Sequence, residues 1–235
     1  MRGQAVILAG GRGTRLGELT KFTPKPMLKI NGRYFLEYII EYLSQNNIKE
    51  VIIVAGYLGN LIYNEFNNKN YKGKLRIKVL IEKNPLGTGG FILKFNDILD
   101  DIFFLLNGDT IFNVDLKKLY LNLDNSRAII ALKKIKKNLR YGNVILNKKS
   151  EITDFEEKKI NRSETLINGG IYLIRKNLKS LINDVPISIE NEIFPSLVKM
   201  KEIKGFIFND YFVDIGIEKD FFSARKKITQ YIELK

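Results

Sequence analysis

The sequence of 235 residues contains no cysteine, no histidine and no tryptophan. Without cysteine, the chain can form no disulfide and offers no thiol nucleophile or thiolate ligand for a metal. The absence of histidine also excludes Ser-His-Asp hydrolysis, Cys-His chemistry and ordinary zinc catalysis. Any chemistry therefore falls to carboxylates, lysine, arginine, tyrosine and metals that prefer oxygen ligands, among which Mg²⁺ fits.

Long hydrophobic runs are also missing, and none reaches the length of a membrane span. The N-terminus has no apolar segment followed by a small-residue cleavage site, so we expect no secretion signal. Hydrophobic residues make up 45% of the chain and charged residues 28%, which is ordinary for a globular protein. We therefore expect a cytoplasmic protein with no membrane partner, folded as a single α/β domain without a linker or an appended module.

The formal net charge of +13 permits binding to nucleic acid, an anionic membrane surface or small anionic substrates. The lysines are scattered, and the densest run consists of Lys133, Lys134, Lys136 and Lys137. Such a run is more often a solvated surface than a nucleic-acid footprint, and the chain lacks the stacking motif of known RNA modules. We expect no nucleic-acid partner. A basic nucleic-acid-binding protein stays an alternative, which salt-sensitive binding to unrelated oligonucleotides would support.

The first half of the chain alternates short apolar runs with amphipathic stretches, which is the rhythm of βαβ units. We expect parallel strands at 4–8, 51–55, 78–81 and 102–106, and helices at 34–46, 58–66 and from about Thr88. Beyond Asp115 we expect shorter strands at 128–132, 143–146, 152–155 and 171–174, and a closing helix at 218–232. This pattern predicts a Rossmann-like, mixed and mainly parallel sheet flanked by helices.

A glycine-rich turn follows the first predicted strand. It reads Leu8-Ala9-Gly10-Gly11-Arg12-Gly13-Thr14-Arg15-Leu16, and Pro24-Lys25-Pro26 comes soon after. Glycines let backbone N–H groups approach phosphate oxygens closely, and the arginines and Lys25 add positive charge. The spacing matches neither G-x-x-x-x-G-K-[ST] nor G-x-G-x-x-G, which excludes the usual P-loop and dinucleotide motifs. The turn therefore predicts a polyphosphate site of another kind.

Two aspartates each follow an apolar run. Asp109 ends Asn107-Gly108-Asp109 after the strand expected at 102–106, and Asp214 lies in Tyr211-Phe212-Val213-Asp214-Ile215-Gly216. A pair of carboxylates can hold one Mg²⁺ that also binds substrate phosphates. Either aspartate alone fits a turn or a helix cap equally well.

Three further segments carry residues suited to ligands: Glu82 with Gly87-Thr88-Gly89-Gly90, Asn168-Gly169-Gly170, and Phe155-Glu156-Glu157-Lys158. The first can bring backbone close to a base or a phosphate, the second can bring an amide to hydroxyl groups, and the third offers a carboxylate beside an ammonium. Each alone is more often an ordinary turn or an exposed charged segment.

Taken together and in this order, these motifs resemble the sugar-1-phosphate nucleotidylyltransferase family, over residues 4–221. Within it, the chain looks most like the D-glycero-α-D-manno-heptose 1-phosphate guanylyltransferases, through the segments 84–90, 166–173 and 211–217. The resemblance implies the nucleotide-diphospho-sugar transferase fold, with a nucleotide-binding half at about 1–115 and a sugar-phosphate-binding half at about 116–235. It also implies that a sugar 1-phosphate, expected to be that of the heptose, attacks the α-phosphorus of a nucleoside triphosphate, expected to be GTP, with Mg²⁺ as cofactor. The attacking oxygen is already an anion, so no general base is needed.

Matching positions give each residue an implied role. The nucleotide would be bound by Leu8, Ala9, Gly10, Gly11, Arg12, Gly13, Thr14, Arg15, Lys25, Glu82, Gly87, Asn107 and Asp109. The sugar phosphate would be bound by Gly142, Glu157, Lys158, Asn168 and Gly169. Asp109 and Asp214 would hold the metal, and the catalytic set would be Arg15, Lys25, Asp109, Lys158 and Asp214.

Other functions stay open at this point. A hexose-specific relative is one: a mannose 1-phosphate guanylyltransferase, an N-acetylmuramate 1-phosphate uridylyltransferase or a glucose 1-phosphate thymidylyltransferase. A non-catalytic nucleotide-binding regulatory protein is another, although Lys25, Asp109 and Asp214 are all present. The chain ends soon after Asp214, so we do not expect the acyltransferase domain that some relatives carry. The sequence leaves a monomer and a homo-oligomer equally open.

Overall fold

The computed structural model describes residues 3–136, 141–156 and 164–232. The chain forms two compact units that interleave along the sequence. Unit 1 comprises Met1–Pro85, Leu105–Asn113 and Tyr211–Lys235, and unit 2 comprises Leu86–Phe104 and Val114–Asp210. The functional division at about residue 115 stays a prediction. In the described residues, no helix is long and apolar enough to cross a membrane.

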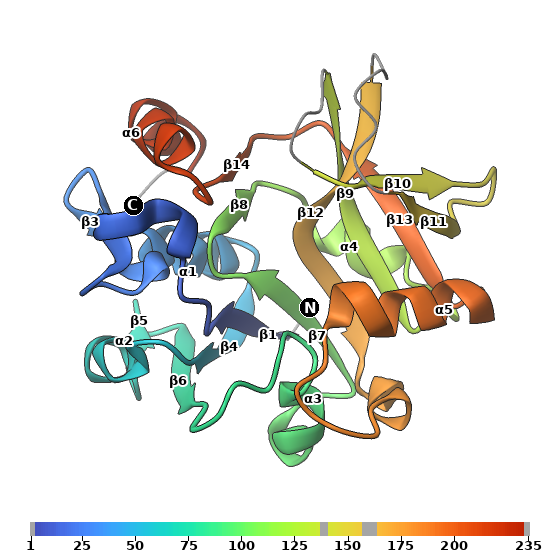
Figure 1. The fold of residues 1–235 in the computed structure, drawn as a ribbon, viewed down its shortest axis with the longest axis horizontal. Coiled ribbons are helices and arrows are strands. Elements are labelled where there is room, and N and C mark those ends of the chain that lie inside the picture. Colours follow the sequence, from blue (N-terminus) through green and yellow to red (C-terminus); the bar gives the residue numbers. More distant parts are fainter. Residues whose placement is uncertain (1–2, 137–140, 157–163, 233–235) are drawn as a thin grey trace. The chain divides into compact units, whose positions relative to one another are not determined.

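Unit 1 contains a sheet with the strand order β7-β1-β4-β6-β5 (Figure 1). These strands are β1 (Gly3–Ala9), β4 (Ile48–Ala55), β5 (Asn70–Tyr71), β6 (Leu75–Ile81) and β7 (Ile102–Asn107), of which β7 begins in unit 2. Strands β1, β4 and β6 are parallel, and β5 joins the edge antiparallel. Two short antiparallel pairs are β2 (Lys29–Ile30) with β3 (Arg33–Tyr34), and β8 (Thr110–Phe112) with β14 (Phe212–Asp214).

The helices of unit 1 are α1 (Phe35–Gln45), α2 (Gly59–Phe66) and α6 (Glu218–Tyr231), with the 3₁₀ segments η1 (Thr14–Thr20) and η2 (Lys25–Met27). Helix α1 packs on β4, and α2 packs on β4 and β6. All three helices lie where the apolar periodicity predicts them. Helices α2 and α6 each bury one face and leave the other to solvent, whereas α1 is buried on nearly all sides and only Gln45 is exposed.

Strands β1 and β4 include the residues predicted from their continuously apolar sequence. Residues 5–7 and 51–55 are buried, as expected for parallel strands covered on both faces. Strand β6 begins at Leu75, three residues before the predicted start at Lys78. Buried Leu75, Ile77 and Val79 alternate there with exposed Arg76 and Lys78, so one face is open and the apolar run is interrupted.

Unit 2 has the strand order β13-β9-β12-β7. Its strands are β9 (Ala128–Lys136), β12 (Glu164–Arg175) and β13 (Ile203–Phe208), and a separate antiparallel pair consists of β10 (Asn143–Leu146) and β11 (Ile152–Glu156). Strand β9 pairs antiparallel with β12 and parallel with β13. The helices are α3 (Phe91–Lys94), α4 (Leu116–Leu121) and α5 (Phe194–Met200), with the 3₁₀ segments η3 (Asn96–Ile98) and η4 (Lys176–Leu181) and the π-helical turn η5 (Ile189–Ile193).

Several predictions for unit 2 were incomplete. Strands β9, β10 and β11 lie where expected, but β12 begins at Glu164 rather than at residue 171. Helix α3 begins at Phe91 rather than at Thr88, because Gly87, at φ 73°, is in a left-handed turn. Strand β13 and helices α4 and α5 were not predicted.

The lysine run also differs in part from the expected solvated surface. Lys134 and Lys136 are exposed, but Lys133 is half-buried and its Nζ donates to the carbonyl oxygens of Asn209 and Asp210, at 2.8 and 2.7 Å. Burial lowers the pKa of Lys133. Lys137 lies outside the described residues.

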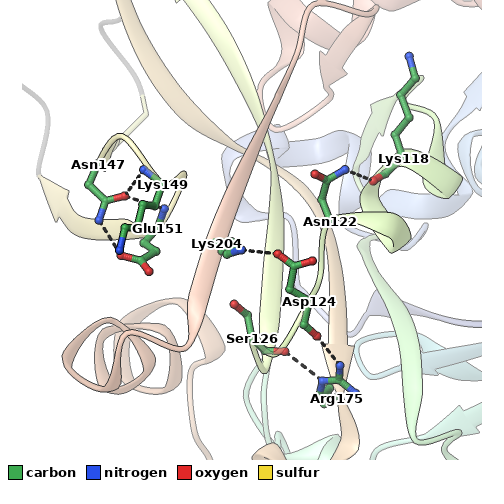
Figure 2. Close-up of polar contacts among 9 residues, drawn as sticks. All are labelled: Lys118, Asn122, Asp124, Ser126, Asn147, Lys149, Glu151, Arg175 and Lys204. Atoms are coloured by element: carbon green, nitrogen blue, oxygen red, sulfur yellow. Dashed lines mark hydrogen bonds and ion pairs between the residues drawn. The ribbon is translucent and has the colours of Figure 1, made fainter.

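A polar network fixes the turn between α4 and β9 (Figure 2). Lys204 Nζ lies 2.6 Å from Asp124 Oδ2, while the Arg175 guanidinium donates to the carbonyl oxygens of Asp124 and Ser126, at 2.7 and 3.1 Å. Asp124 has φ 46°, a conformation that aspartate tolerates better than most residues. Arg175 belongs to β12 and Lys204 to β13, so the network attaches this turn to both strands and has a structural role.

Candidate functional site

The glycine-rich turn leaves β1 at Ala9 and reaches η1 at Thr14. Gly13 has φ 64°, and its carbonyl oxygen accepts a hydrogen bond from Thr20 Oγ1 at 3.0 Å. A Cβ on Gly13 would lie 3.0 Å from Thr20 Cγ2 and 3.3 Å from Lys25 Cβ, so the turn packs against the segment that carries Lys25. Gly11 differs: apart from Gly11 itself and its two chain neighbours, no heavy atom of the described residues lies within 4 Å of the position of its Cβ. The turn is therefore held at Gly13 and open at Gly11.

The cations of the turn are directed to solvent. Arg12 and Arg15 are exposed, as are Gly11 and Thr14. Within residues 3–136, 141–156 and 164–232, neither arginine side chain takes part in a hydrogen bond or an ion pair. Both guanidinium groups are thus available to an anionic ligand, as the predicted polyphosphate site requires.

The other wall of the turn comes from β4 and β6. Tyr57 N donates to Gly10 O at 3.2 Å, and Glu82 N donates to Ala55 O at 2.8 Å. A Cβ on Gly10 would lie 3.1 Å from Glu82 Oε2. Glu82 is therefore a neighbour of the glycine-rich turn in unit 1, although it lies 72 positions after Gly10 in the sequence. Of the predicted nucleotide residues, Gly10 thus lies beside Glu82.

Lys25 is buried, with 7% of its surface exposed, and it forms an ion pair with Asp109. Its Nζ lies 2.5 Å from Asp109 Oδ2. The Lys25 side chain is 8% exposed and that of Asp109 31% exposed, so the lysine comes from inside the unit and the carboxylate faces outward. A buried ammonium requires such a partner, because an unpaired charge in the interior is costly.

Asp109 is fixed in place by the turn that follows β7. Gly108 N donates to Leu8 O at 2.8 Å, and a Cβ on Gly108 would lie 2.5 Å from the same oxygen. Only glycine therefore fits at position 108 without a shift of the backbone. Half-buried Asn107 ends β7 just before this contact. The motif Asn107-Gly108-Asp109 thus lies directly against the start of the glycine-rich turn.

Asp214 lies beside Asp109, although 105 positions separate them in the sequence. Strand β14 pairs with β8 so that Asp214 is opposite Thr110, and Ile215 N donates to Asp109 O at 3.0 Å. The rings of Phe112 and Phe212 pack edge to face behind this pair, with centroids 5.5 Å apart. Unit 1 therefore brings together the glycine-rich turn, Lys25 and both predicted metal ligands.

The donor set of these aspartates suits Mg²⁺, which prefers carboxylate oxygens and keeps positions for water and phosphate. Among the described residues, no group of three or more acidic, histidine or cysteine side chains could hold a metal. Two protein carboxylates are the usual number for a Mg²⁺ ion that shares its remaining ligands with a substrate. The residues therefore fit the ion that the sequence predicts.

In unit 2, the Gly87 turn packs against the segment before α5. Gly89 N donates to Ile187 O at 2.9 Å, and Ile187 N donates to Leu86 O at 3.0 Å. A Cβ on Gly87 would lie 2.2 Å from Ile187 O. Gly87 has a positive φ and lies against the backbone of Ile187, so a residue with a Cβ would be strained and would clash there.

Asn168 and Gly169 lie at an irregularity of β12. Asn168 is opposite Leu132 on β9, but Tyr172 is opposite Ile130, so the register shifts between them. Asn168 Oδ1 accepts from Gly170 N at 2.9 Å, and its Nδ2 donates to Tyr172 Oη at 3.0 Å. Such bulges redirect side chains and are frequent near active sites. The bulge fixes the amide of Asn168 in one orientation.

The remaining predicted sugar-phosphate residues are only partly described. Gly142 is exposed, and a Cβ there would lie 3.2 Å from Glu156 O. Asn143, next to it, donates to Glu156 Oε2 at 3.2 Å and accepts from Leu166 N at the same distance. Glu157 and Lys158 lie outside the described residues.

Sequence reasoning missed three residues of unit 2 that contact these segments: Thr88, Tyr172 and Glu190. Thr88 and Tyr172 lie in the segments 84–90 and 166–173, which carry the resemblance, but their contacts with Glu190 were not predicted. Nothing in the sequence indicated a role for Glu190, because it lies in a π-helical turn that apolar periodicity does not predict.

The sequence pattern described as Nucleotidyl transferase matches residues 4–231. The chain belongs to this family. It is 42% identical over 223 residues to a D-glycero-alpha-D-manno-heptose 1-phosphate guanylyltransferase of Campylobacter jejuni subsp. jejuni, covering 93% of this chain and 97% of the relative. A protein of the same name from Aneurinibacillus thermoaerophilus is 39% identical over 235 residues, and the match covers 97% of this chain and 100% of the relative.

Solved structures agree with this assignment. HddC from Yersinia pseudotuberculosis is similar with a TM-score of 0.86 at 30% identity, covering 96% of this chain and 99% of that one. The same protein complexed with GMP-PN gives a TM-score of 0.84. The predicted resemblance and the predicted fold class, a mixed and mainly parallel sheet flanked by helices, are confirmed. The protein is a nucleotidyltransferase.

Proposed function

We propose that this protein transfers the guanylyl group of GTP to D-glycero-α-D-manno-heptose 1-phosphate and releases pyrophosphate. Two relatives that this chain matches over nearly its whole length carry the name of this activity. The structural observation that carries the proposal is the cluster in unit 1, in which the glycine-rich turn, Lys25, Asp109 and Asp214 lie together. Such a cluster suits a triphosphate and the metal bound to it.

The chemistry is a single displacement at the α-phosphorus. A phosphate oxygen of the sugar 1-phosphate forms the new bond, and the bond from the α-phosphorus to the bridging oxygen of pyrophosphate breaks. Because the nucleophile is already ionised, the protein has no proton to remove, which agrees with a chain without histidine. What the protein supplies is positioning and positive charge.

We propose that Arg12 and Arg15 bind the β- and γ-phosphates, with Arg15 stabilising the departing pyrophosphate. Both guanidinium groups are exposed and form no hydrogen bond or ion pair within the described part of the chain, which supports this role. Gly11, Gly13 and Thr14 would present backbone N–H groups to the same phosphates. Lys25 would stabilise charge on the α-phosphate, a role supported by its ammonium beside the partly exposed carboxylate of Asp109.

Asp109 and Asp214 would hold Mg²⁺, which neutralises the negative charge of the triphosphate when bound. The pairing of β8 with β14 brings Asp214 opposite Thr110, the residue after Asp109, and Asp214 Oδ1 accepts from Gly216 N at 2.5 Å, which orients that side chain. This backbone pairing supports the proposal that Asp109 and Asp214 act together as oxygen ligands.

For the base, we propose backbone contacts from Leu8, Ala9, Gly10 and Gly87, with Asn107 on the nucleotide. Glu82 is a suitable acceptor for guanine, whose N1–H and amino group both donate. The carboxylate of Glu82 beside Gly10 supports this choice. For the sugar phosphate, we propose Gly142, Asn168 and Gly169, together with Glu157 and Lys158. We further propose that the protein acts in the cytoplasm, where nucleoside triphosphates are made.

The proposal is tested by a pyrophosphate-release screen in the presence of Mg²⁺. GTP, UTP, CTP, dTTP and ATP are each paired with heptose, mannose, glucose and N-acetylmuramate 1-phosphates. We expect turnover with GTP and the heptose and none with the other pairs. Turnover with a hexose pair would identify a hexose-specific enzyme instead, and binding of nucleotide without turnover on any pair would point to a regulatory protein.

A further inference from the structure

Glu190 accepts hydrogen bonds from two segments that the proposed function assigns to different substrates. It lies in the π-helical turn η5, which Ser188 caps by accepting from Asn191 N at 3.1 Å. Ser188 Oγ also donates to Glu190 Oε2 at 3.3 Å. Glu190 is half-buried. Irregular π turns of this kind are frequently found at functional sites, where they place a side chain that a regular helix would not.

The first segment is the Gly87 turn. Thr88 Oγ1 donates to Glu190 Oε2 at 2.6 Å and accepts from Ile189 N at 2.9 Å. With the backbone hydrogen bonds between Leu86, Gly89 and Ile187, these contacts hold the Gly87 turn against η5. The short distance from Thr88 is typical of a hydroxyl that donates to a carboxylate.

The second segment is the bulge of β12. Tyr172, which is fully buried, donates its hydroxyl to Glu190 Oε1 over a long distance of 3.5 Å. The same hydroxyl oxygen accepts from Asn168 Nδ2 at 3.0 Å. A chain of hydrogen bonds therefore runs from Asn168 through Tyr172 and Glu190 to Thr88, all within unit 2.

We propose that Glu190 is a positioning residue that couples the Gly87 turn to Asn168, and so couples binding of the nucleotide to binding of the sugar phosphate. The inference rests on the proposed function, which gives these segments to GTP and to the sugar phosphate. A carboxylate is suited to the task because both oxygens accept, one from Thr88 and the other from Tyr172. A glutamine accepts on one side only and has no charge, so one hydroxyl no longer donates to a carboxylate oxygen and both charge-assisted hydrogen bonds are lost.

The first test compares Glu190→Gln with Glu192→Gln, a matched control from the same turn. Glu192 Oε1 accepts from Ser188 N at 2.8 Å, an interaction that glutamine can also make, and within the described residues Glu192 forms no hydrogen bond with Thr88 or Tyr172. We expect Glu190→Gln to raise the KM for both GTP and heptose 1-phosphate about five- to tenfold, as loss of a hydrogen bond to a charged group predicts. Glu192→Gln should leave both KM values unchanged. A merely structural role would lower the melting temperature without moving either KM, and that result would overturn the proposal.

The second test measures the coupling itself with Thr88→Val and Tyr172→Phe, alone and together. The two residues are linked through Glu190, so we expect their effects on kcat/KM to depart from a simple product by threefold or more, roughly the coupling seen for residues of one network. In the Glu190→Ala background, the two effects should multiply. Independent effects in the wild-type background would contradict the coupling. Thr88→Ser keeps the hydroxyl, so its KM values for GTP and for the heptose 1-phosphate should equal those of the wild-type protein.

These outcomes are separable from the proposed function. The wild-type protein is first screened for its substrate pair, and failure with GTP and the heptose there refutes the proposed function alone. The variants are then measured with the pair that the wild type uses. If Glu190→Gln does not fold, the Thr88→Val and Tyr172→Phe cycle in the wild-type background still decides the proposal.

Discussion

Lys25 Nζ lies 2.5 Å from Asp109 Oδ2, and the lysine is the more deeply buried partner. The two residues come from different motifs, Pro24-Lys25-Pro26 and Asn107-Gly108-Asp109, and Ile215 N joins Asp214 to them through Asp109 O. A predicted phosphate contact and a predicted metal ligand are thus held by one ion pair. The charge of each therefore matters both to the fold of unit 1 and to any ligand bound there.

Asp109→Asn should lower turnover by about a hundred- to a thousandfold, because an amide is a poor ligand for Mg²⁺ and no longer balances the ammonium of Lys25. The measurement is Mg²⁺-dependent pyrophosphate release at saturating substrates, with a melting curve for each variant.

The control for this change is Asp97→Asn, at an exposed aspartate of η3. It should behave as wild type in both measurements. Retention of most activity by Asp109→Asn would refute the metal role of Asp109, and a protein that no longer melts cooperatively would show that the ion pair serves the fold first.

Gly11→Ala separates the needs of the ligand from the needs of the fold. A Cβ at Gly11 meets no heavy atom within 4 Å, so the melting temperature should not change. If the backbone at Gly11 approaches a phosphate, the added methyl group should raise the KM for GTP roughly ten- to a hundredfold.

Gly108→Ala is the contrasting variant, because its Cβ would lie 2.5 Å from Leu8 O. It should be destabilised by about 1–3 kcal/mol, as expected for a forced backbone shift. A Gly11→Ala protein with an unchanged KM for GTP would argue against a phosphate contact at that residue.

Lys158→Ala should raise the KM for the sugar phosphate about tenfold and the KM for GTP much less, because a lost charge-assisted hydrogen bond affects only the ligand that it binds. Lys158 lies outside the described residues, so this role stays a prediction from the resemblance. Initial rates with each substrate varied in turn give both constants. Equal increases would contradict the assignment of Lys158 to the sugar phosphate.

The strands of unit 1 could be predicted because a strand that is buried on both faces has a continuously apolar sequence. Residues 5–7 in β1 and 51–55 in β4 are the examples. Strand β6 shows the limit of this signal, since its exposed face interrupts the run at Arg76 and Lys78. Strand β12 was found only in part, because the glycines that form its bulge at Gly169 and Gly170 do not indicate a strand.

The site was predicted residue by residue but not as a geometry. The pairing of Asp109 with Asp214 depends on β8 and β14, two strands of 3 residues that are too short for any periodicity. The family resemblance joined these aspartates, and the structure adds the ion pair to Lys25. Glu190 was invisible, because an isolated glutamate in the sequence carries no sign of its partners.

Unit 1 also contains a buried carboxylate whose protonation should weaken the fold in acid. Glu41, on α1, is 3% exposed and accepts from Tyr71 Oη and Lys72 Nζ, both at 2.6 Å. Burial raises the pKa of Glu41, but the hydrogen bonds from Lys72 and Tyr71 outweigh it and lower the pKa below its usual value of 4.5. The same carboxylate and burial together raise the pKa of Tyr71.

A pKa that is lower in the folded protein than in the unfolded chain means that the folded state favours the ionised form of Glu41. Its contribution to stability is complete above pH 4.5 and is lost as the pH falls through the lowered pKa of the folded state. Glu41→Gln, which cannot make the ion pair with Lys72, should reduce the free energy of unfolding by about 2 kcal/mol at neutral pH. Urea unfolding of both proteins from pH 7 to pH 3 tests this. The difference should shrink toward the acid end of that range, because Glu41 becomes protonated first in the unfolded chain, below pH 4.5, and then in the folded protein at its lowered pKa. A difference that stays constant would mean that Glu41 acts through packing and not through its charge.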